Sequence, residues 1–503
     1  MKNKKILIIV FVVIVLVIIT AILQMGKYKK VEKLSGIKFV DPYNVEITNY
    51  DGNKMPFTIE KTNEDTKIYV NGREYKSGER IYKIGEYEVK VQNGKQMEKS
   101  TIKINTIEKK EENAYNIYVI SETLQTLLAS LDLSSNVEQK GFLWTARTST
   151  LDLDRVKENI PNIQQSAYNG TLNVDEFKTQ VVPELKQYIQ NILQQDENAY
   201  FKLYMEEDKF YLELELFGKI GLDDSRYDVT MYTDGTLGYV RQYEITENEK
   251  YERFQKEKAD YFEIVDQIKN NTKETNGYPG SYLVDKESPI FNVSYNLDYM
   301  LISTLRKNIK FLMQYPECLT FADEDIAKEM ENANIQKIVA QDEFSKLNEN
   351  QKEVFFKNIN LDKDELDSKY FTKKDSKYLI ITGTTPFYEN MSEEKFQEII
   401  KKVSEDYGKE YTILYKPHPR ALPTKEQEQF LNNLDIKVLP GKIPMEAIMF
   451  IYPNLQLGGF ASSLYMSTDE GKTLFFFAKD KNELVSPLDK LYDTIFKDAK
   501  FYN

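Results

Sequence analysis

The stretch Tyr411-Thr-Ile-Leu-Tyr-Lys-Pro-His-Pro-Arg420 contains His418, the only histidine among the 503 residues of the chain. Its first five residues are β-branched, aromatic or aliphatic, a composition that predicts a buried strand. Pro417 and Pro419 cannot continue a central strand, so the strand ends in a stiff turn that carries the histidine. Because ligands of open α/β sheets bind at the carboxyl ends of the strands, we expect His418 at such an edge, where it could donate to a phosphate oxygen. The alternative is a surface turn that the His-Pro pair merely shapes.

Composition and charge limit the kind of protein that the chain encodes. With 503 residues, 41% of them hydrophobic and 29% charged, the chain is long enough for roughly two to four domains with their own cores. The net charge of −13 argues against a general nucleic-acid binder, which would need a wide basic face. Cys318 is the only cysteine, which excludes an internal disulfide framework and a cysteine-based metal cluster. With one histidine as well, a zinc site would need carboxylates almost alone, so we expect no metal cofactor.

The amino terminus has the pattern of a membrane anchor. Ile6 to Leu23 is an apolar run of 18 residues preceded by lysines, which is long enough to span a bilayer. No small-residue cleavage site follows it, so residues 1–30 predict an uncleaved single-pass anchor, with a removed signal peptide as the alternative. Lysines flank the run on both sides, and its orientation therefore stays open.

Residues 36–107 change to short alternating runs such as Lys67-Ile-Tyr-Val70 and Gly85-Glu-Tyr-Glu-Val-Lys-Val91. The Asn-Gly pairs that begin at Asn71 and Asn93 are typical of tight turns between antiparallel strands. This pattern predicts a small all-β sandwich, and it resembles bacterial immunoglobulin-like modules of surface proteins. A spacer is the role we expect, with carbohydrate binding as the alternative.

Beyond a charged hinge at 109–113, strand and helix patterns alternate, which predicts mostly parallel sheets covered by helices. We expect strands at 116–120, 200–204, 229–232 and 378–381, and helices at 182–193, 301–315 and 393–407. A turn-rich break at 276–280 divides this region, so we predict two α/β domains facing across a cleft, at 113–284 and 285–480. We expect helices at 481–503 to pack back towards the first of these domains.

Two strand ends carry polar residues on glycine turns. Asp234 follows the strand 229–232 and precedes Gly235, although Asp-Gly is also an ordinary turn pair. Gly383 and Thr384 follow the strand at 378–381, where the missing side chain would let a ligand approach closely. Both positions are candidates for a ligand site at the carboxyl edge of a sheet.

Two further candidates lie in the second α/β domain. Glu446 falls in the first turn of an apolar helix, where the helix dipole favours glutamate in any case. In Leu455-Gln-Leu-Gly-Gly-Phe-Ala-Ser-Ser-Leu464, a strand and two glycines lead to Ser462 and Ser463 at a helix start. Free backbone N–H groups and hydroxyls there make an anion site, and the alternative is an ordinary serine N-cap.

These motifs, in this order and at similar spacing, resemble the bacterial sialyltransferases of glycosyltransferase family 80. The resemblance is carried by Tyr232-Thr-Asp-Gly235, Ile380-Ile-Thr-Gly-Thr-Thr385, Tyr415-Lys-Pro-His-Pro-Arg420, Pro444-Met-Glu446 and Gly458-Gly-Phe-Ala-Ser-Ser-Leu-Tyr465, and it runs from about Tyr115 to the carboxyl terminus. It implies a GT-B fold, in which two Rossmann-like domains, the first on the acceptor side and the second binding the donor, face one another across the active site. It also implies CMP-sialic acid as donor substrate and no metal.

The resemblance further implies a role for each matching residue. Asp234 would be the general base on the acceptor hydroxyl, and Lys416 would lie near the cytosine. Glu446 would hold the ribose hydroxyls, with Gly383 and Thr384 also on the donor side. The CMP phosphate would be bound by His418, Ser462 and Ser463.

Departures from the family pattern concern mainly the acceptor side. Thr233 stands at a position that is usually acidic, and Pro417 replaces a residue that is usually glycine. Phe387 occupies the place of an expected tryptophan stacked over the substrates, and Arg147 is a further expected cleft residue on the acceptor side. Acceptor identity is therefore the property that the resemblance transfers least.

Our leading hypothesis is a membrane-anchored, metal-independent, inverting sialyltransferase that moves sialic acid from CMP to a galactose-type acceptor on a surface glycan. A second enzyme hypothesis is another CMP-releasing transferase that uses CMP-Kdo or CDP-glycerol. A third is a non-catalytic, glycan-binding surface protein. The anchor followed by an immunoglobulin-like module favours the cell surface, whereas nucleotide sugars are made in the cytosol, so the side of the membrane stays open.

Overall fold

A computed structural model describes two compact units, Met1–Glu108 and Lys109–Asn503, which we treat separately. The described residues are 34–40, 58–79, 81, 85–104, 114–170, 174–209, 212–233, 251–269, 297–319, 321, 323–373, 376–384, 392–418, 421–485 and 487–503. The expected anchor at 1–30 lies outside them. Among the helices that are described, none is both long and apolar enough to cross a membrane.

Within the first unit, the described residues form only β-strands and turns, as predicted for 36–107. One sheet pairs β1 (Ile37–Val40) with β2 (Thr58–Lys61), and the other has the order β4-β3-β5-β6, all antiparallel. The strands of the second sheet are β3 (Lys67–Val70), β4 (Arg73–Glu74), β5 (Gly85–Asn93) and β6 (Gln96–Ile104). Both Asn-Gly turns join antiparallel neighbours, and Asn71 and Gly72 have the positive φ angles, 49° and 79°, that such turns require. One hydrophobic core is shared by both sheets, because Ile59 packs with Ile68 and Val89.

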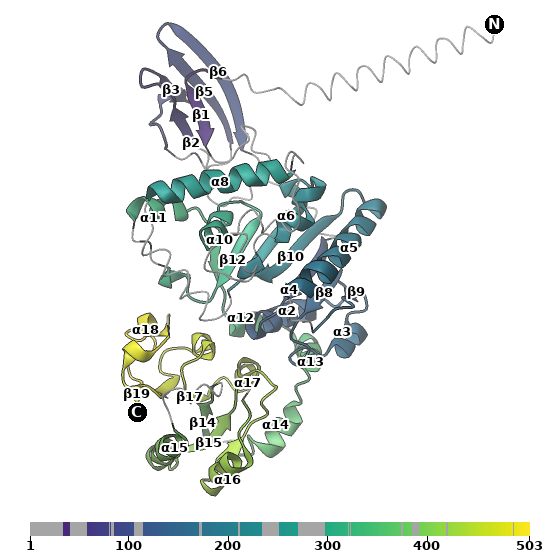
Figure 1. The fold of residues 1–503 in the computed structure, drawn as a ribbon, viewed down its shortest axis with the longest axis vertical. Coiled ribbons are helices and arrows are strands. Elements are labelled where there is room, and N and C mark those ends of the chain that lie inside the picture. The colour runs from purple at the N-terminus through teal and green to yellow at the C-terminus, as the bar shows by residue number, and fades with distance from the viewer. Residues whose placement is uncertain are drawn as a thin grey trace, which may run out of the picture. The chain divides into compact units, whose positions relative to one another are not determined.

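The second unit begins with a seven-stranded parallel sheet in the order β13-β12-β11-β10-β7-β8-β9 (Figure 1). Its strands are β7 (Ala114–Ile120), β8 (Lys140–Thr145), β9 (Ile163–Gln165), β10 (Tyr200–Glu206), β11 (Tyr227–Tyr232), β12 (Ile309–Met313) and β13 (Ile335–Lys337). The helices that accompany it include α2 (Thr123–Ser135), α5 (Val182–Gln195), α8 (Tyr251–Lys269), α10 (Leu297–Ser303), α12 (Ala340–Ser345) and α13 (Glu349–Asn358). The expected strands at 116–120, 200–204 and 229–232 and the helix at 182–193 are confirmed.

Two predictions about the middle of the chain were wrong. The helix expected at 301–315 ends at Ser303, and β12 follows in its place, because Ile309, Phe311 and Met313 are buried at every second position. The domain boundary expected at 284/285 does not coincide with the sheets, since β12 and β13 complete the first sheet. The turn-rich segment at 276–280, which suggested the boundary, lies outside the described residues.

A second parallel sheet follows, with six strands in the order β16-β15-β14-β17-β18-β19. Its strands are β14 (Lys377–Thr382), β15 (Tyr411–Lys416), β16 (Lys437–Val438), β17 (Gln456–Gly459), β18 (Thr473–Phe476) and β19 (Lys500–Phe501). One face packs Leu379 and Ile381 against α15 (Glu393–Tyr407), while Ile380 on the other face belongs to the core that also contains α17 (Met445–Ile451). The expected strand at 378–381 and the helix at 393–407 are confirmed.

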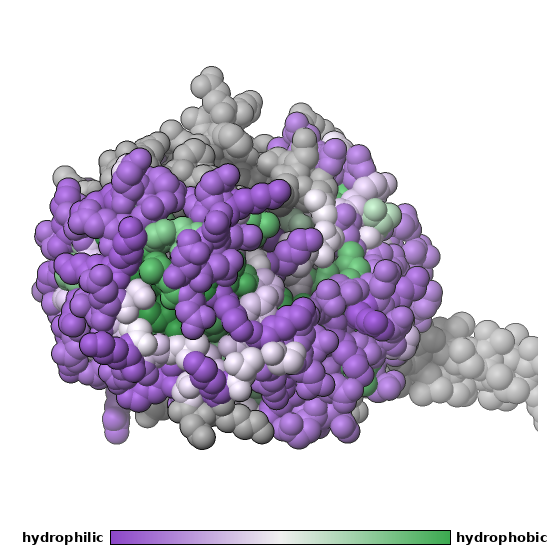
Figure 2. Space-filling view, turned by 90° about the horizontal axis from the view of Figure 1, so that it is seen from below, coloured by the Kyte–Doolittle hydropathy of each residue, from purple (hydrophilic) through white to green (hydrophobic). Residues whose placement is uncertain are grey.

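The surface at the end of the second sheet's domain is largely hydrophilic. Figure 2 looks onto the lower end of Figure 1, where α15 and α16 (Lys425–Asn433) lie, and hydrophobic residues are visible there mainly in one central area. This follows from helix α15, which buries Phe396, Ile399 and Val403 on one face and turns its charged residues to solvent.

We predicted helices at 481–503, but the last residues of the chain are only partly helical. A short helix α18 (Leu488–Leu491) is present, but β19 closes the second sheet by pairing with β18. The buried Phe476 of β18 and Phe501 of β19 are register partners, which explains why this end of the chain is a strand.

Candidate active site

The candidate donor residues follow three neighbouring strands of the second sheet. In the register of β15, β14 and β17, Lys416, Thr382 and Gly459 form one row across the sheet. The backbone N–H of Gly383 donates to the Lys416 carbonyl at 2.8 Å, and that of Phe460 donates to the Thr382 carbonyl at 3.1 Å. The strands are parallel, so the turns that follow them meet at the same edge.

Glycine at position 383 allows two of these turns to touch. A Cβ atom there would lie 2.6 Å from the Tyr415 hydroxyl and 3.3 Å from the backbone nitrogen of His418. The turn after β14 therefore lies directly against the turn that carries the histidine. Gly459 has a φ of +128°, and a Cβ there would lie 2.6 Å from the Thr382 carbonyl oxygen, so both the backbone conformation and the space require glycine.

His418 lies on a tight turn at the end of β15, as predicted. The backbone N–H of Ala421 donates to the His418 carbonyl at 2.9 Å, and the two residues form an isolated antiparallel bridge. Pro417 is buried, whereas the His418 side chain is partly exposed at the sheet edge. The imidazole is thus carried by a short, hydrogen-bonded loop with one side open to solvent.

Lys416 and Glu446 lie close enough for their charges to interact. The Lys416 side chain is buried, and its Nζ donates to the carbonyls of Pro417 (3.2 Å) and Gly441 (3.0 Å). Burial lowers the pKa of Lys416 to about 8, against the effect of the Glu446 charge. Burial likewise raises the pKa of Glu446, which lies in the first turn of α17, against a backbone hydrogen bond and the Lys416 charge. Both groups are therefore shifted towards their neutral forms.

Ser462 and Ser463 follow β17 at the same edge. The helix expected after them is a short 3₁₀ helix, η8 (Ser463–Ser467). Ser462 is its N-cap residue, yet its side chain makes no capping hydrogen bond within the described part of the chain. The reading of Ser462 as an ordinary capping serine is therefore not what the geometry shows, and its partly exposed hydroxyl can face a ligand.

Asp234 and Phe387 lie outside the described residues, but the residue before Asp234 is firmly held. The N–H and the hydroxyl of Thr233 both donate to the Leu312 carbonyl of β12, at 3.2 and 2.9 Å. The Thr233 carbonyl accepts from Nε2 of Gln125 in α2 at 2.6 Å. Strand β11 thus delivers the chain to position 234 from a buried residue clamped on both sides.

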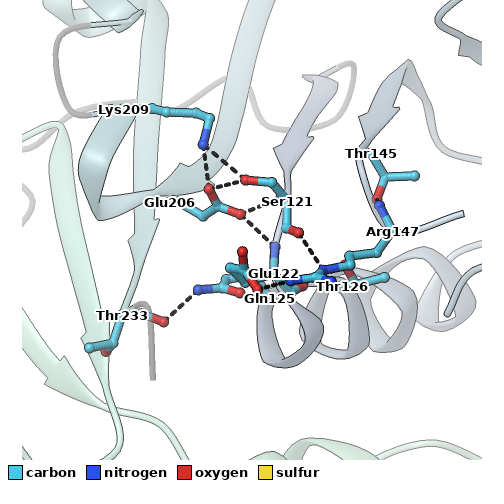
Figure 3. A network of polar contacts seen from close by, with 9 residues as sticks. All are labelled: Ser121, Glu122, Gln125, Thr126, Thr145, Arg147, Glu206, Lys209 and Thr233. Atoms are coloured by element: carbon cyan, nitrogen blue, oxygen red, sulfur yellow. Dashed lines mark hydrogen bonds and ion pairs between the residues drawn. The ribbon is translucent and has the colours of Figure 1, made fainter. Parts of the chain in front are cut away.

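Arg147 belongs to a polar network at the carboxyl edge of the first sheet (Figure 3). Its Nε donates to the Ser121 carbonyl at 2.8 Å, and Nη2 forms an ion pair with Glu122. Ser121 and Glu122 follow β7, and Arg147 follows β8, so the network joins two neighbouring strand ends. The structure therefore places Arg147 at the carboxyl edge of the first sheet.

Glu206 and Lys209, which sequence reasoning missed, are the buried part of this network. The Glu206 carboxylate accepts from the N–H and hydroxyl of Ser121, from the N–H of Glu122 (2.7 Å) and from Lys209. Burial opposes ionisation of Glu206, but the charge and hydrogen bonds of Lys209 and Ser121 outweigh it and lower its pKa. The sequence did carry a signal for this pair, because charged residues at and just after the end of a buried strand must be paired to be buried.

Metal ligands do not gather in the described part of the chain. No group of three or more His, Cys, Asp or Glu side chains there could hold a metal ion. The donors at the sheet edge are instead backbone N–H groups, hydroxyls and an imidazole, which suit an anionic ligand.

Two parallel α/β sheets, with candidate residues at their carboxyl edges, give the chain a GT-B-like glycosyltransferase fold. A family model described as Sialyltransferase PMO188 matches residues 222–497, more than half of the chain, and the protein belongs to this family of glycosyltransferases. No protein of known, curated function matches the chain significantly.

Solved structures share the fold at low sequence identity. An α/β-galactoside α-2,3-sialyltransferase from Photobacterium phosphoreum has a TM-score of 0.56 and 16% identity, over 78% of this chain and 99% of that one. A sialyltransferase from Photobacterium damsela has a TM-score of 0.54 and 15% identity, over 94% of this chain and 96% of that one. The 2,6-sialyltransferase of Photobacterium sp. JT-ISH-224, solved with CMP and lactose, has a TM-score of 0.53 and 17% identity, over 94% and 92% of the two chains.

Proposed function

We propose that the protein is an inverting, metal-independent sialyltransferase that transfers sialic acid from CMP-sialic acid to a galactose-type acceptor on a surface glycan. The observation that carries the proposal is the meeting of three strand ends at one sheet edge, where Gly383, His418 and Ser462 lie next to the Lys416–Thr382–Gly459 row. Membership of the sialyltransferase family supports it. So does the related 2,6-sialyltransferase that binds CMP and lactose together.

On the donor side, the proposed roles follow from charge. Cleavage of the bond to CMP leaves negative charge on the phosphate while the sugar becomes oxocarbenium-like. Hydrogen-bond donors already in place at that phosphate stabilise the transition state without a cation. We assign this task to His418, Ser462 and Ser463, with Gly383 and Thr384 giving the nucleotide close access.

The nucleoside would lie beside Lys416 and Glu446. Glu446 accepts hydrogen bonds from the ribose hydroxyls in this proposal, and it does so best as a carboxylate. In its ammonium form, Lys416 has three N–H donors, two of which are hydrogen-bonded to carbonyls, so it shapes the cytosine pocket and contacts the base with the third.

On the acceptor side, Asp234 would remove the proton of the acceptor hydroxyl as this oxygen attacks the anomeric carbon. Attack from the face opposite CMP inverts the configuration at that carbon. General base catalysis of this kind contributes about 10²–10⁴-fold. Arg147 and Phe387 would contact the acceptor.

We also propose that residues 1–30 anchor the protein in the membrane and that residues 36–107 are an immunoglobulin-like spacer. The supporting observations are the apolar run from Ile6 to Leu23 and the antiparallel strands of the first unit. The cell surface is the side of the membrane that this arrangement favours.

The decisive test measures CMP release by the full chain from CMP-N-acetylneuraminic acid, with and without lactose, in EDTA. Lactose-dependent release that persists in EDTA supports the proposal. Absence of release with this donor, followed by release from CMP-Kdo or CDP-glycerol, would replace it with the second enzyme hypothesis. Inactivity on all donors, with glycan binding retained, would favour a binding protein.

Variants test the residue roles in the same assay. Asp234→Asn and His418→Ala are expected to lower transfer by at least about 100-fold. Asp228→Asn, near the start of strand β11 and away from the carboxyl edge of the sheet, is the matched control and should keep near wild-type activity. Full transfer by both site variants would refute the assigned roles.

A further inference from the structure

The hydroxyl of Tyr465 is a buried polar group that the proposed chemistry does not use. The Tyr465 side chain is fully buried in η8, three residues after Ser462. Its hydroxyl lies 2.7 Å from the Thr382 hydroxyl, which is itself buried at the end of β14. Burial raises the pKa of Tyr465 well above its ordinary value, so the hydroxyl keeps its proton and remains a donor.

Thr382 occupies the centre of the donor-side edge. It is the register partner of Lys416 on one side and of Gly459 on the other. Its hydroxyl lies 3.1 Å from the Phe460 carbonyl and 3.3 Å from the Gly458 carbonyl. The Thr382 hydroxyl has one proton, which these carbonyls accept, so it receives its hydrogen bond from Tyr465.

This bond joins η8 to the strand beside the histidine turn. In the chain, Ser462 and Ser463 lie between Phe460 and Tyr465. The N–H of Phe460 and the hydroxyl of Tyr465 both form hydrogen bonds with Thr382. The serine pair is therefore held at both ends by one residue. The same residue precedes Gly383, which touches the backbone of the His418 turn.

We infer that Tyr465, through its hydrogen bond to Thr382, is a positioning residue that sets the distance between the Ser462–Ser463 pair and His418. Hydrophobic packing alone would not define this position as narrowly. A phenylalanine fills the same space, whereas the hydroxyl bond has one geometry. The inference rests on the proposed function, because it concerns the groups assigned to the CMP phosphate.

The test compares the affinities of the full chain for CMP and for cytidine, which lacks the phosphate. The Tyr465→Phe and Thr382→Val variants each remove one hydroxyl of the pair and keep the shape of the side chain. Tyr502→Phe is the matched control, because Tyr502 is also buried in this half and its hydroxyl donates to Asp406 at 2.6 Å, away from the site. Thr382→Ser retains the hydroxyl and should keep the wild-type affinity for CMP.

We expect Tyr465→Phe to weaken CMP binding by about tenfold and to leave cytidine binding within about twofold of wild type. Thr382→Val should behave alike, and the double variant should lose little more than either single one, because both remove the same bond. Tyr502→Phe should keep the full preference for CMP over cytidine.

Three other outcomes overturn the inference and can be told apart. If the wild-type chain binds CMP no more tightly than cytidine, both the proposed phosphate site and the inference are refuted. If the wild-type chain prefers CMP to cytidine and Tyr465→Phe and Thr382→Val keep this preference, only the inference is refuted. Equal weakening of CMP and cytidine in these variants would mean general damage to the nucleotide pocket, and it too would overturn the positioning role.

Discussion

Lys416 links the donor side of the site to pH. Its pKa is lowered to about 8 because burial disfavours the ammonium form. In the unfolded chain the same amine titrates near 10.5. Between these two values the unfolded chain holds a proton that the folded chain has released, so the free energy of unfolding rises with pH in this window. Below pH 8 the buried charge costs stability.

Replacing Lys416 with methionine should remove this dependence. The difference in unfolding free energy, Lys416→Met minus wild type, should fall as pH rises from 8 to 10.5, by up to about 3 kcal/mol in all. Urea denaturation at three pH values measures it. Lys409→Met, at an exposed lysine, is the control for the loss of one positive charge. A flat difference for Lys416→Met would show that the buried amine titrates normally.

Single residues of the donor side could be predicted from the sequence because they lie in short, continuous motifs. His418 on its proline turn and Gly383 at its strand end were placed by local rules alone. The Tyr465–Thr382 bond could not be predicted, since it joins positions 83 residues apart. The same holds for Glu206, which meets Ser121 across 85 residues. Such contacts depend on strand order, which local sequence does not specify.

Helix α2 clamps the end of strand β11 through Gln125, which donates to the Thr233 carbonyl. We predict that Gln125→Leu lowers kcat for transfer by about tenfold or more, because the chain entering position 234 loses a fixed point. CMP affinity should be unchanged, since the donor side is untouched. Thr126→Val is the control, because Thr126 is also buried on α2 but its hydroxyl donates to the Glu122 carbonyl at the start of the same helix. An unaltered kcat in Gln125→Leu would remove α2 from the positioning of the base.

The buried Glu206–Lys209 pair holds the start of α2, whose N-cap residue Glu122 makes no side-chain cap. Glu206→Leu should lower the free energy of unfolding by about 3–5 kcal/mol, because the buried charge of Lys209 loses the carboxylate with which it is paired. The double variant Glu206→Leu, Lys209→Leu should recover a large part of this loss. The lowered pKa of Glu206 also predicts that its contribution is present at neutral pH and is lost as pH falls below the ordinary range of glutamate. Equal losses in the single and double variants would contradict the charge argument.

Among the elements, those with strong local signals were predicted best. Helix α15 coincides with the expected 393–407, because Ser392 caps it and its apolar residues follow the helical period. The prediction for 301–315 was wrong because a helix and a strand lie only a few positions apart there. Their apolar residues overlap in the sequence, so the helical period could not be told apart from the strand period. Tertiary pairing of β12 with β11 decided the outcome.

For the whole molecule, the proposed anchor makes a direct prediction. Leu16→Lys places a charge at the middle of the apolar run, which costs about 2.5–3.5 kcal/mol on insertion. We expect a much smaller share of the expressed Leu16→Lys protein than of the Leu16→Ala protein in the carbonate-washed membrane fraction. Equal shares for the two variants would refute the anchor.

The two sheets of the second unit are joined close to Ser462 and Ser463. Nε2 of Gln314, just after β12, donates to the Ser467 hydroxyl of η8 at 2.9 Å, and the hydroxyl of Tyr315 donates to the Thr468 carbonyl at 3.3 Å. The next turn, η7 (Pro316–Cys318), carries the only cysteine. Residues of the short helix α18 lie near enough to influence the Cys318 thiol.

Cys318 therefore gives the native protein a built-in probe. Burial raises the pKa of its thiol to about 11, so at neutral pH little thiolate is present and modification is slow. Any movement that separates the β12 side from η8 and α18 would expose the thiol and speed its reaction. With no other cysteine in the chain, one labelling rate, followed with and without nucleotide, would report any such movement without an engineered residue.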